Sequence, residues 1–193
     1  MLGTFRDGRY RAFFTVVYQC GLRLREALHI KPKHIDGKRL VIRVVDTKGG
    51  REREVPITRE LRDRLRRFWR SHRNPEWLFP GTGRGWKSSG TTLRQALGAC
   101  RHSMTDASVW QAFKIAKIEC GLDRIHEKLT IHTLRHSYAT HMLEGGASPR
   151  QVSAYLGHRS LKPTMVYLHL TEISEQNARI ALATLAGSET STR

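Results

Sequence analysis

Four side chains in residues 131–170 have the types and the spacing of a site that handles phosphate. His132 and Arg135 lie three positions apart, so on a helix both side chains would face one ligand. A guanidinium binds phosphate oxygens through two hydrogen bonds, and a neighbouring histidine can move a proton. His158 and Tyr167 follow, and the tyrosine adds a hydroxyl nucleophile that is weak unless cationic neighbours favour the phenolate.

The order of these residues resembles the tyrosine recombinase family, the site-specific DNA recombinases of the phage integrase and XerC/XerD type. The pattern H-x-x-R, then G-H, then a late tyrosine is present within residues 132–167. The resemblance extends upstream to GLRLREAL, which contains Arg23, and to TKGGREREVPI, which contains Lys48. All six positions of the family's active-site pattern are therefore filled in the family's order.

The resemblance implies a strand transesterification on double-stranded DNA. Tyr167 would attack a DNA phosphodiester, form a 3′-phosphotyrosyl link and release a 5′-hydroxyl. Arg23 and Arg135 would bind the two non-bridging oxygens and stabilise the charge of the pentacovalent state. Lys48 would act as general acid on the leaving 5′ oxygen. Because the covalent link conserves the bond energy, a second 5′-hydroxyl can reverse the step on another strand, which is recombination.

The histidines have roles under this resemblance and one competing interpretation. His132 would take the proton from Tyr167 or orient the phosphate, and His158 would hydrogen-bond a phosphate oxygen. His132 and His136 also have the i, i+4 spacing of metal ligands. No glutamate follows His132 as the HExxH motif requires, and a third ligand is not obvious, so we expect no metal and no cofactor.

Charge indicates the class of partner. The chain of 193 residues has 34 Lys and Arg against 17 Asp and Glu, a formal net charge of +17. This excess favours a polyanion, nucleic acid first and an anionic membrane surface second. No apolar run approaches the roughly 20 residues of a membrane span, and the start lacks a signal-peptide core. Three cysteines outside any metal-ligand spacing indicate reduced thiols, so we expect a cytoplasmic, nucleoid-associated protein with no membrane partner.

Apolar periodicity and helix-capping residues predict a mainly α fold with a small antiparallel sheet (α+β), as the family's catalytic domain has. The last predicted helix of the core carries Tyr167, and the helix before the glycine pair at 145 should pack Leu134, Tyr138 and Met142 inward. The predicted helices cover about 9–19, 23–28, 59–70, 105–120, 132–143, 149–156, 163–168 and 171–187. The first carries an apolar stripe that includes Phe13, Phe14 and Val17, and the third should turn Leu61, Leu65, Phe68 and Trp69 inward. The glycines and prolines of residues 71–103 indicate a loop, with a short helix at 91–100.

A β-hairpin is predicted from residues 39–45 and 51–57, with Lys48 at its tip. Most lysines in such places are merely solvated, and it is the resemblance that makes Lys48 the general acid. Its basic flanks make the hairpin a finger thin enough to lie along a DNA groove. The expected DNA contacts are Arg43, Arg51, Arg53 and Arg159.

Arg23 follows the helix break at Gly21, which should point it out of the core, and Glu26 three residues later can hold its guanidinium. Residues 1–187 are expected to form the catalytic domain, followed by a disordered tail at 188–193. The chain begins where that domain begins in the family, so we expect the N-terminal core-binding domain to be absent. The family's C-terminal helix, here 171–187, docks in cis or in trans, which implies self-association on DNA and a tetrameric synapse of the full-length protein.

Three other functions remain open on the sequence. A type IB topoisomerase-like relaxing enzyme uses a similar set of residues but exchanges no partners. A DNA-binding module without chemistry would explain the charge, and residues 148–168 resemble a helix–turn–helix. A ribosomal or other RNA-binding protein also fits the charge, although the order of the six residues would then be coincidence.

Overall fold

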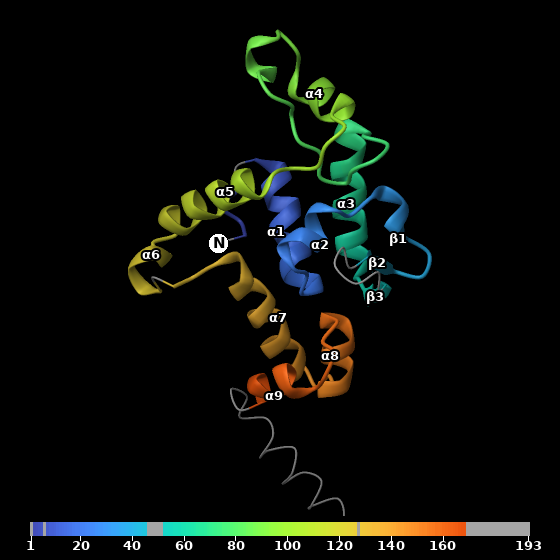
Figure 1. Cartoon of the computed structure of the whole chain (residues 1–193), viewed down its shortest axis with the longest axis vertical. Helices are drawn as coiled ribbons and strands as arrows, with labels where there is room; N and C mark the ends of the chain where they lie inside the picture. Colours follow the sequence, from blue (N-terminus) through green and yellow to red (C-terminus); the bar gives the residue numbers. More distant parts are fainter. Residues whose placement is uncertain (1, 6, 46–51, 127, 169–193) are drawn as a thin grey trace, which may run out of the picture. The chain divides into compact units, whose positions relative to one another are not determined.

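The computed structural model describes residues 2–5, 7–45, 52–126 and 128–168. The chain divides into two units, residues 1–138 and 139–193, and the boundary falls inside helix α7 (Ile131–Glu144). Figure 1 shows the order of the elements along the chain. Both units are helical, and the first also contains a sheet of three strands.

The first unit contains most of the elements. In chain order they are α1 (Gly8–Cys20), α2 (Leu24–Leu28), the 3-10 helix η1 (Pro32–His34), β1 (Ile35–Asp36), β2 (Val41–Val45), β3 (Glu52–Pro56), α3 (Arg59–His72), the 3-10 helix η2 (Trp86–Ser88), α4 (Leu93–Ala99), α5 (Asp106–Glu119), α6 (Leu122–Ile125) and the start of α7. The second unit contains the rest of α7, then α8 (Pro149–Leu156) and α9 (Lys162–Leu168). No helix in the part of the chain that the structure describes is long and apolar enough to cross a bilayer.

Helix α1 supplies the central side chains of the first unit's core. Its apolar stripe is confirmed, because Phe13, Phe14 and Val17 are fully buried. The Phe13 ring meets Phe79 edge-on with centroids 5.2 Å apart, and the Phe14 ring lies 5.6 Å from Phe113. These contacts join α1 to α5 and to the segment after α3, so one aromatic cluster fixes the helices around α1.

The sheet has the order β1-β2-β3 and is antiparallel throughout. The predicted hairpin is confirmed in β2 and β3, with Ile42 opposite Val55 and Val44 opposite Arg53. Strand β1 was not predicted, because two residues are too few to show a pattern. Residues 46–51, which include the predicted tip with Lys48, lie outside the described residues.

Helix α3 continues from the sheet and begins where predicted. The Thr58 hydroxyl accepts a hydrogen bond from the backbone N–H of Leu61 at 3.1 Å, which caps the helix. Leu61 and Leu65 are buried, and α3 packs against α1. Phe68 and Trp69, also predicted inward, are half-buried.

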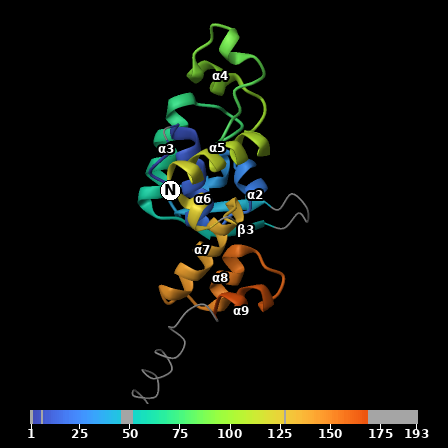
Figure 2. The ribbon, with the colours of Figure 1, turned by 90° about the vertical axis from the view of Figure 1, so that its left-hand side faces the viewer.

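The segment between α3 and α5, which the sequence analysis could resolve only into a loop and a short helix, is anchored by Asn74. The buried Asn74 amide nitrogen donates to the carbonyls of Leu97 and Cys100, each at 2.8 Å. A Cβ on Gly98 would lie 2.8 Å from the carbonyl oxygen of His72, so only glycine allows α4 to approach this closely. In both views α4 lies beyond the C-terminal end of α3 (Figures 1 and 2).

The second unit also begins its helices near the predicted places. Ser148 and Gln151 form a capping box at the start of α8, and Gly157 ends that helix with φ 66°. Helix α9 begins at Lys162, one residue before the predicted start at Pro163. The predicted helix at 171–187 and the predicted tail at 188–193 lie outside the described residues.

The inward face of α7 agrees only in part with the prediction. Tyr138 is buried, and Leu134 is half-buried and packs against the core as predicted, but Met142 is only half-buried. The fully buried side chains of this helix include Arg135, which has 2% of its surface exposed. The apolar pattern was a poor guide here because a charged residue occupies the buried face.

Leu65 and Leu93 provide a matched test of the first unit's core. Leu65→Ala in α3 should lower the free energy of unfolding by about 2 to 5 kcal/mol, because it removes a buried side chain and leaves a cavity. Leu93→Ala in α4, where the side chain is exposed, should change it by about 0.5 kcal/mol or less. Urea unfolding of both variants measures the difference, and equal losses would show that α3 does not pack as described.

Candidate active site

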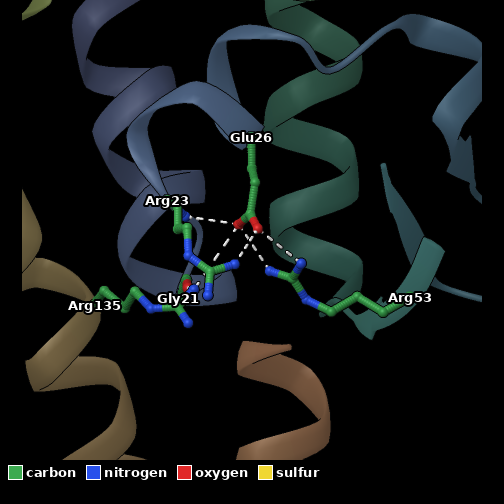
Figure 3. Close-up of polar contacts among 5 residues, drawn as sticks. All are labelled: Gly21, Arg23, Glu26, Arg53 and Arg135. Atoms are coloured by element: carbon green, nitrogen blue, oxygen red, sulfur yellow. Dashed lines mark hydrogen bonds and ion pairs between the residues drawn. The ribbon is translucent and has the colours of Figure 1, made fainter. Parts of the chain in front are cut away.

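Glu26 in α2 is the centre of a cluster of three arginines in the first unit (Figure 3). Its carboxylate side chain is 5% exposed. Oxygen Oε1 accepts from Nη1 of Arg23 at 2.8 Å and from Nη1 of Arg53 at 2.9 Å. Oxygen Oε2 accepts from the backbone N–H of Arg23 and from Nη2 of Arg53, both at 2.8 Å. A buried carboxylate needs such partners, because desolvation would otherwise make its charge costly.

Arg23 occupies the N-cap position of α2, which explains its direction. Its backbone is extended, with φ −69° and ψ 152°, so its side chain leaves the helix axis as predicted after the break at Gly21. The Arg23 side chain is 43% exposed and gives one guanidinium nitrogen to Glu26. The predicted contact between Arg23 and Glu26 is therefore present, and the guanidinium remains accessible to a ligand.

Arg135 reaches the same place from α7, although it is 112 positions after Arg23 in the sequence. Its Nη1 donates to the carbonyl oxygen of Gly21 at 2.7 Å and lies 3.9 Å from Oε2 of Glu26. The Arg135 side chain is 3% exposed. The carbonyl that ends α1 therefore holds one catalytic candidate, while Arg23 begins α2 two residues later.

Arg53, which the sequence analysis expected to contact DNA, has a largely buried side chain. Its side chain is 13% exposed and forms a bidentate ion pair with Glu26. Side chains alternate along a strand, so Arg53 lies on the same face of β3 as the buried Val55. That alternation, together with the acid at Glu26, is the sequence signal that could have identified the pair.

The protonation of Glu26 follows from these contacts. Burial by itself would raise the pKa of Glu26, but the hydrogen bonds and positive charge of Arg53, then of Arg23, outweigh burial and lower that pKa below its ordinary value. Glu26 is therefore ionised at neutral pH. Three guanidinium groups against one carboxylate leave the cluster with an excess of positive charge.

His132 stands at the start of α7, one turn before His136. The two rings lie 4.7 Å apart and nearly perpendicular. Partial burial, then the neighbouring His136, Arg135 and Arg23, lower the pKa of His132 below its ordinary value. A neutral imidazole at pH 7 can accept a proton, which is what a general base requires.

The second unit contains the other two candidates. The backbone N–H of His158 donates to the carbonyl of Ser153 at 3.0 Å, which continues the turn that ends α8 at Gly157. Its ring nitrogen Nδ1 lies 2.8 Å from Oγ1 of Thr164 in α9. Thr164 is fully buried, and Tyr167, three residues later in α9, is 7% exposed. Thr164 therefore ties His158 to the helix that carries Tyr167, a contact that the sequence analysis missed.

The remaining candidates are Lys48 and the other arginines predicted to contact DNA. Lys48 and Arg51 fall outside the described residues. Arg43 is exposed on β2 and lies 3.8 Å from Glu52, and Arg159 is exposed after α8. Within the described ranges, no group of three or more His, Cys, Asp or Glu side chains could hold a metal ion.

Comparison with known proteins places these residues in a family context. The sequence profile described as the Phage integrase family matches residues 4–173. A putative integrase/recombinase, y4qK, of Sinorhizobium fredii (strain NBRC 101917 / NGR234) is 38% identical over 169 residues, which are 88% of this chain and 49% of that protein. Tyrosine recombinase XerD of Ralstonia nicotianae (strain ATCC BAA-1114 / GMI1000) is 35% identical over 162 residues, which are 84% of this chain and 48% of that protein. The chain thus spans about half the length of the relatives it matches.

A solved structure confirms the predicted fold class. The Tn1549 transposon integrase in complex with circular intermediate DNA superimposes with a TM-score of 0.68 at 19% identity. The superposition covers 94% of this chain and 63% of that chain. At this identity the match concerns the fold, a mostly helical domain with a small antiparallel sheet.

Glu26 and Glu54 allow a controlled test of the buried cluster. Glu26→Gln should lower the free energy of unfolding by about 3 to 5 kcal/mol, because it leaves buried arginines without their counter-charge. Glu54→Gln breaks the bidentate pair with Arg39 on the surface, at 2.7 and 2.6 Å, and should have little effect because solvent screens it. The pKa of Glu26 is lowered in the fold, so its stabilisation is complete above the unfolded pKa and is lost as pH falls through the folded pKa. Unfolding curves of wild type and E26Q should therefore converge in acid, and a constant difference down to low pH would contradict the ionised cluster.

Proposed function

The chain belongs to the phage integrase family, and on this premise we propose that it is the catalytic part of a site-specific DNA recombinase. It would cleave and rejoin DNA strands through a 3′-phosphotyrosyl intermediate. The relatives that it matches over most of its length are named as integrases and recombinases, which favours strand exchange over relaxation of supercoils or binding without chemistry.

The observation that carries this proposal is the convergence of Arg23 and Arg135. Two arginines from distant parts of the sequence lie against one carboxylate, and one of them is partly exposed. A phosphodiester carries two non-bridging oxygens, and the charge on them grows as a nucleophile adds to phosphorus. Preorganised guanidinium groups stabilise this charge more in the transition state than in the substrate, which is how they accelerate the reaction.

The remaining catalytic groups complete a balanced transesterification. The Tyr167 oxygen forms a bond to phosphorus, the bond from phosphorus to the 5′ oxygen breaks, and Lys48 gives that oxygen a proton. His132, whose pKa is lowered by burial and by its cationic neighbours, takes the proton from Tyr167 or orients the phosphate. His158 hydrogen-bonds a phosphate oxygen. The reverse reaction with a 5′-hydroxyl from another strand completes the exchange.

Double-stranded DNA is the proposed substrate, in the bacterial nucleoid. Support comes from the net charge of +17 and from the Tn1549 integrase, whose structure is of a complex with DNA. The proposed contacts with the DNA backbone are Arg43, Arg51 and Arg159. Residues 171–187 are proposed to mediate self-association on DNA, with a tetrameric synapse formed by the full-length protein.

Tyr167→Phe tests the proposed function most simply. On a nicked suicide duplex containing the target site, wild type should form a protein–DNA adduct that resists denaturation. Tyr167→Phe should form none while its DNA affinity stays nearly unchanged, because only a hydroxyl is lost. Tyr155→Phe, in α8, serves as the control and should form the adduct normally. An adduct that persists in Y167F would exclude Tyr167 as the nucleophile.

Lys48→Ala tests the assignment of the general acid. The variant should cleave DNA slowly, since general acids contribute about 10² to 10⁴ in rate. A substrate with sulfur at the 5′ bridging position should recover most of this loss, because a thiolate leaves without a proton. The comparison uses single-turnover rates on both substrates. Equal recovery by Arg135→Ala would mean that the sulfur effect does not report on Lys48.

A further inference from the structure

We infer that Arg53 is a positioning residue for Arg23 and Arg135, and that it acts by holding Glu26 rather than by touching DNA. This inference rests on the proposed function of the same site and adds a residue to it. Arg53 lies 27 positions after Glu26, in strand β3. Arg23 is at the N-cap of α2, and Arg135 is within α7. Figure 3 shows the guanidinium groups of Arg23 and Arg53 directed at the Glu26 carboxylate, with the Arg135 guanidinium beside Gly21 and near the same carboxylate.

The geometry gives Arg53 a place that differs from those of the other two arginines. Its two Nη atoms pair with the two oxygens of Glu26, at 2.9 and 2.8 Å, so that one guanidinium spans the whole carboxylate. Such a bidentate pair fixes the plane of the carboxylate as well as its position. Arg23 uses one guanidinium nitrogen on Oε1, and Arg135 stands 3.9 Å from Oε2 while it donates to Gly21.

Charge explains why this arrangement matters for a phosphate ligand. A carboxylate next to two phosphate-binding arginines competes with the substrate for them. Because Arg53 supplies a full counter-charge to Glu26, the charges of Arg23 and Arg135 are left to act on the phosphate. Without Arg53, Glu26 would draw the nearest guanidinium groups toward itself, and the net positive charge of the cluster would fall by one.

The burial of the Arg53 side chain distinguishes a positioning role from a direct contact with DNA. The Arg53 side chain is 13% exposed, against 48% for Arg43 on the neighbouring strand. The positive charge of Arg53 acts on a group inside the protein. The hydrogen bonds and charge of Arg53 are the main cause that lowers the pKa of Glu26, against the opposite effect of burial. A residue that binds DNA phosphates releases counterions from the DNA, and a residue that is paired internally does not.

The test compares Arg53→Gln and Arg53→Lys with Arg39→Gln. Arg39 is the matched control, because it forms a bidentate pair with Glu54 on the same sheet but at the exposed surface. Two quantities are measured for each folded variant, the rate of adduct formation at saturating suicide duplex and the slope of log affinity against log salt concentration. Unfolding midpoints are recorded first, and rates are compared well below the lowest midpoint.

Arg53→Gln should slow adduct formation about 100-fold, the cost of misplacing groups around the reacting phosphate, while the salt slope stays at the wild-type value. The rate of adduct formation by Arg53→Lys should lie between those of wild type and Arg53→Gln, because a lysine ammonium cannot bind both carboxylate oxygens as a guanidinium does. Arg39→Gln should keep the wild-type rate. A normal rate in R53Q with a salt slope smaller by about 0.9 would identify Arg53 as a DNA contact and overturn the inference. If R53Q does not fold, R53K decides, since a wild-type rate in R53K would overturn it equally.

Two further measurements test the inference. The first shows whether Arg53 acts through Glu26, and the second shows whether the site binds phosphate independently of DNA cleavage. The rate loss of the double variant Arg53→Gln/Glu26→Gln should be smaller than the product of the two single losses, and independent losses would contradict the inference. Inorganic phosphate should raise the unfolding midpoint of wild type and R39Q but not of R53Q. If wild type binds phosphate in this way but forms no adduct, the proposed function fails while the role of Arg53 stands. A wild type that shows neither effect overturns both.

Discussion

The charge of Glu26 is the constraint on which the rest of the site depends. A carboxylate that is 5% exposed must be fully paired, and here its partners include Arg23 and Arg135, the two arginines proposed to bind a phosphate. Arg23 follows the end of α1, Arg53 comes from β3 and Arg135 from α7, so three separate parts of the first unit meet at one group. Folding of this unit and assembly of the proposed phosphate-binding site are therefore the same event.

The surrounding fold explains why these three elements can meet. The aromatic cluster around Phe13 and Phe14 fixes α1, and the carbonyl of Gly21 at its end accepts the hydrogen bond from Arg135. The antiparallel pairing of β2 and β3 sets the alternation that directs Arg53 inward with Val55. In the second unit, the contact between His158 and Thr164 plays a comparable part, because it links the end of α8 to the helix of Tyr167.

Features encoded by neighbouring residues could be predicted from the sequence. The stripe on α1, the hairpin, the caps of α3 and α8, and the pair of Arg23 with Glu26 depend on residues a few positions apart. Features that depend on distant parts of the chain could not. Arg53 was assigned to DNA from the charge of the strand, and although its alternation with Val55 indicates an inward side chain, its partner Glu26 lies 27 positions away in the sequence. The burial of Arg135 on α7 does not follow from the apolar pattern of Leu134 and Met142.

A crystal structure of the chain trapped on a suicide duplex would test the central claim directly. We expect Arg23 and Arg135 both to contact the non-bridging oxygens of the phosphate joined to Tyr167. We also expect Arg53 to keep both hydrogen bonds to Glu26, at about 2.8 to 2.9 Å. A structure in which Arg53 has left Glu26 for the DNA backbone, or in which Glu26 holds Arg135 away from the phosphate, would contradict it.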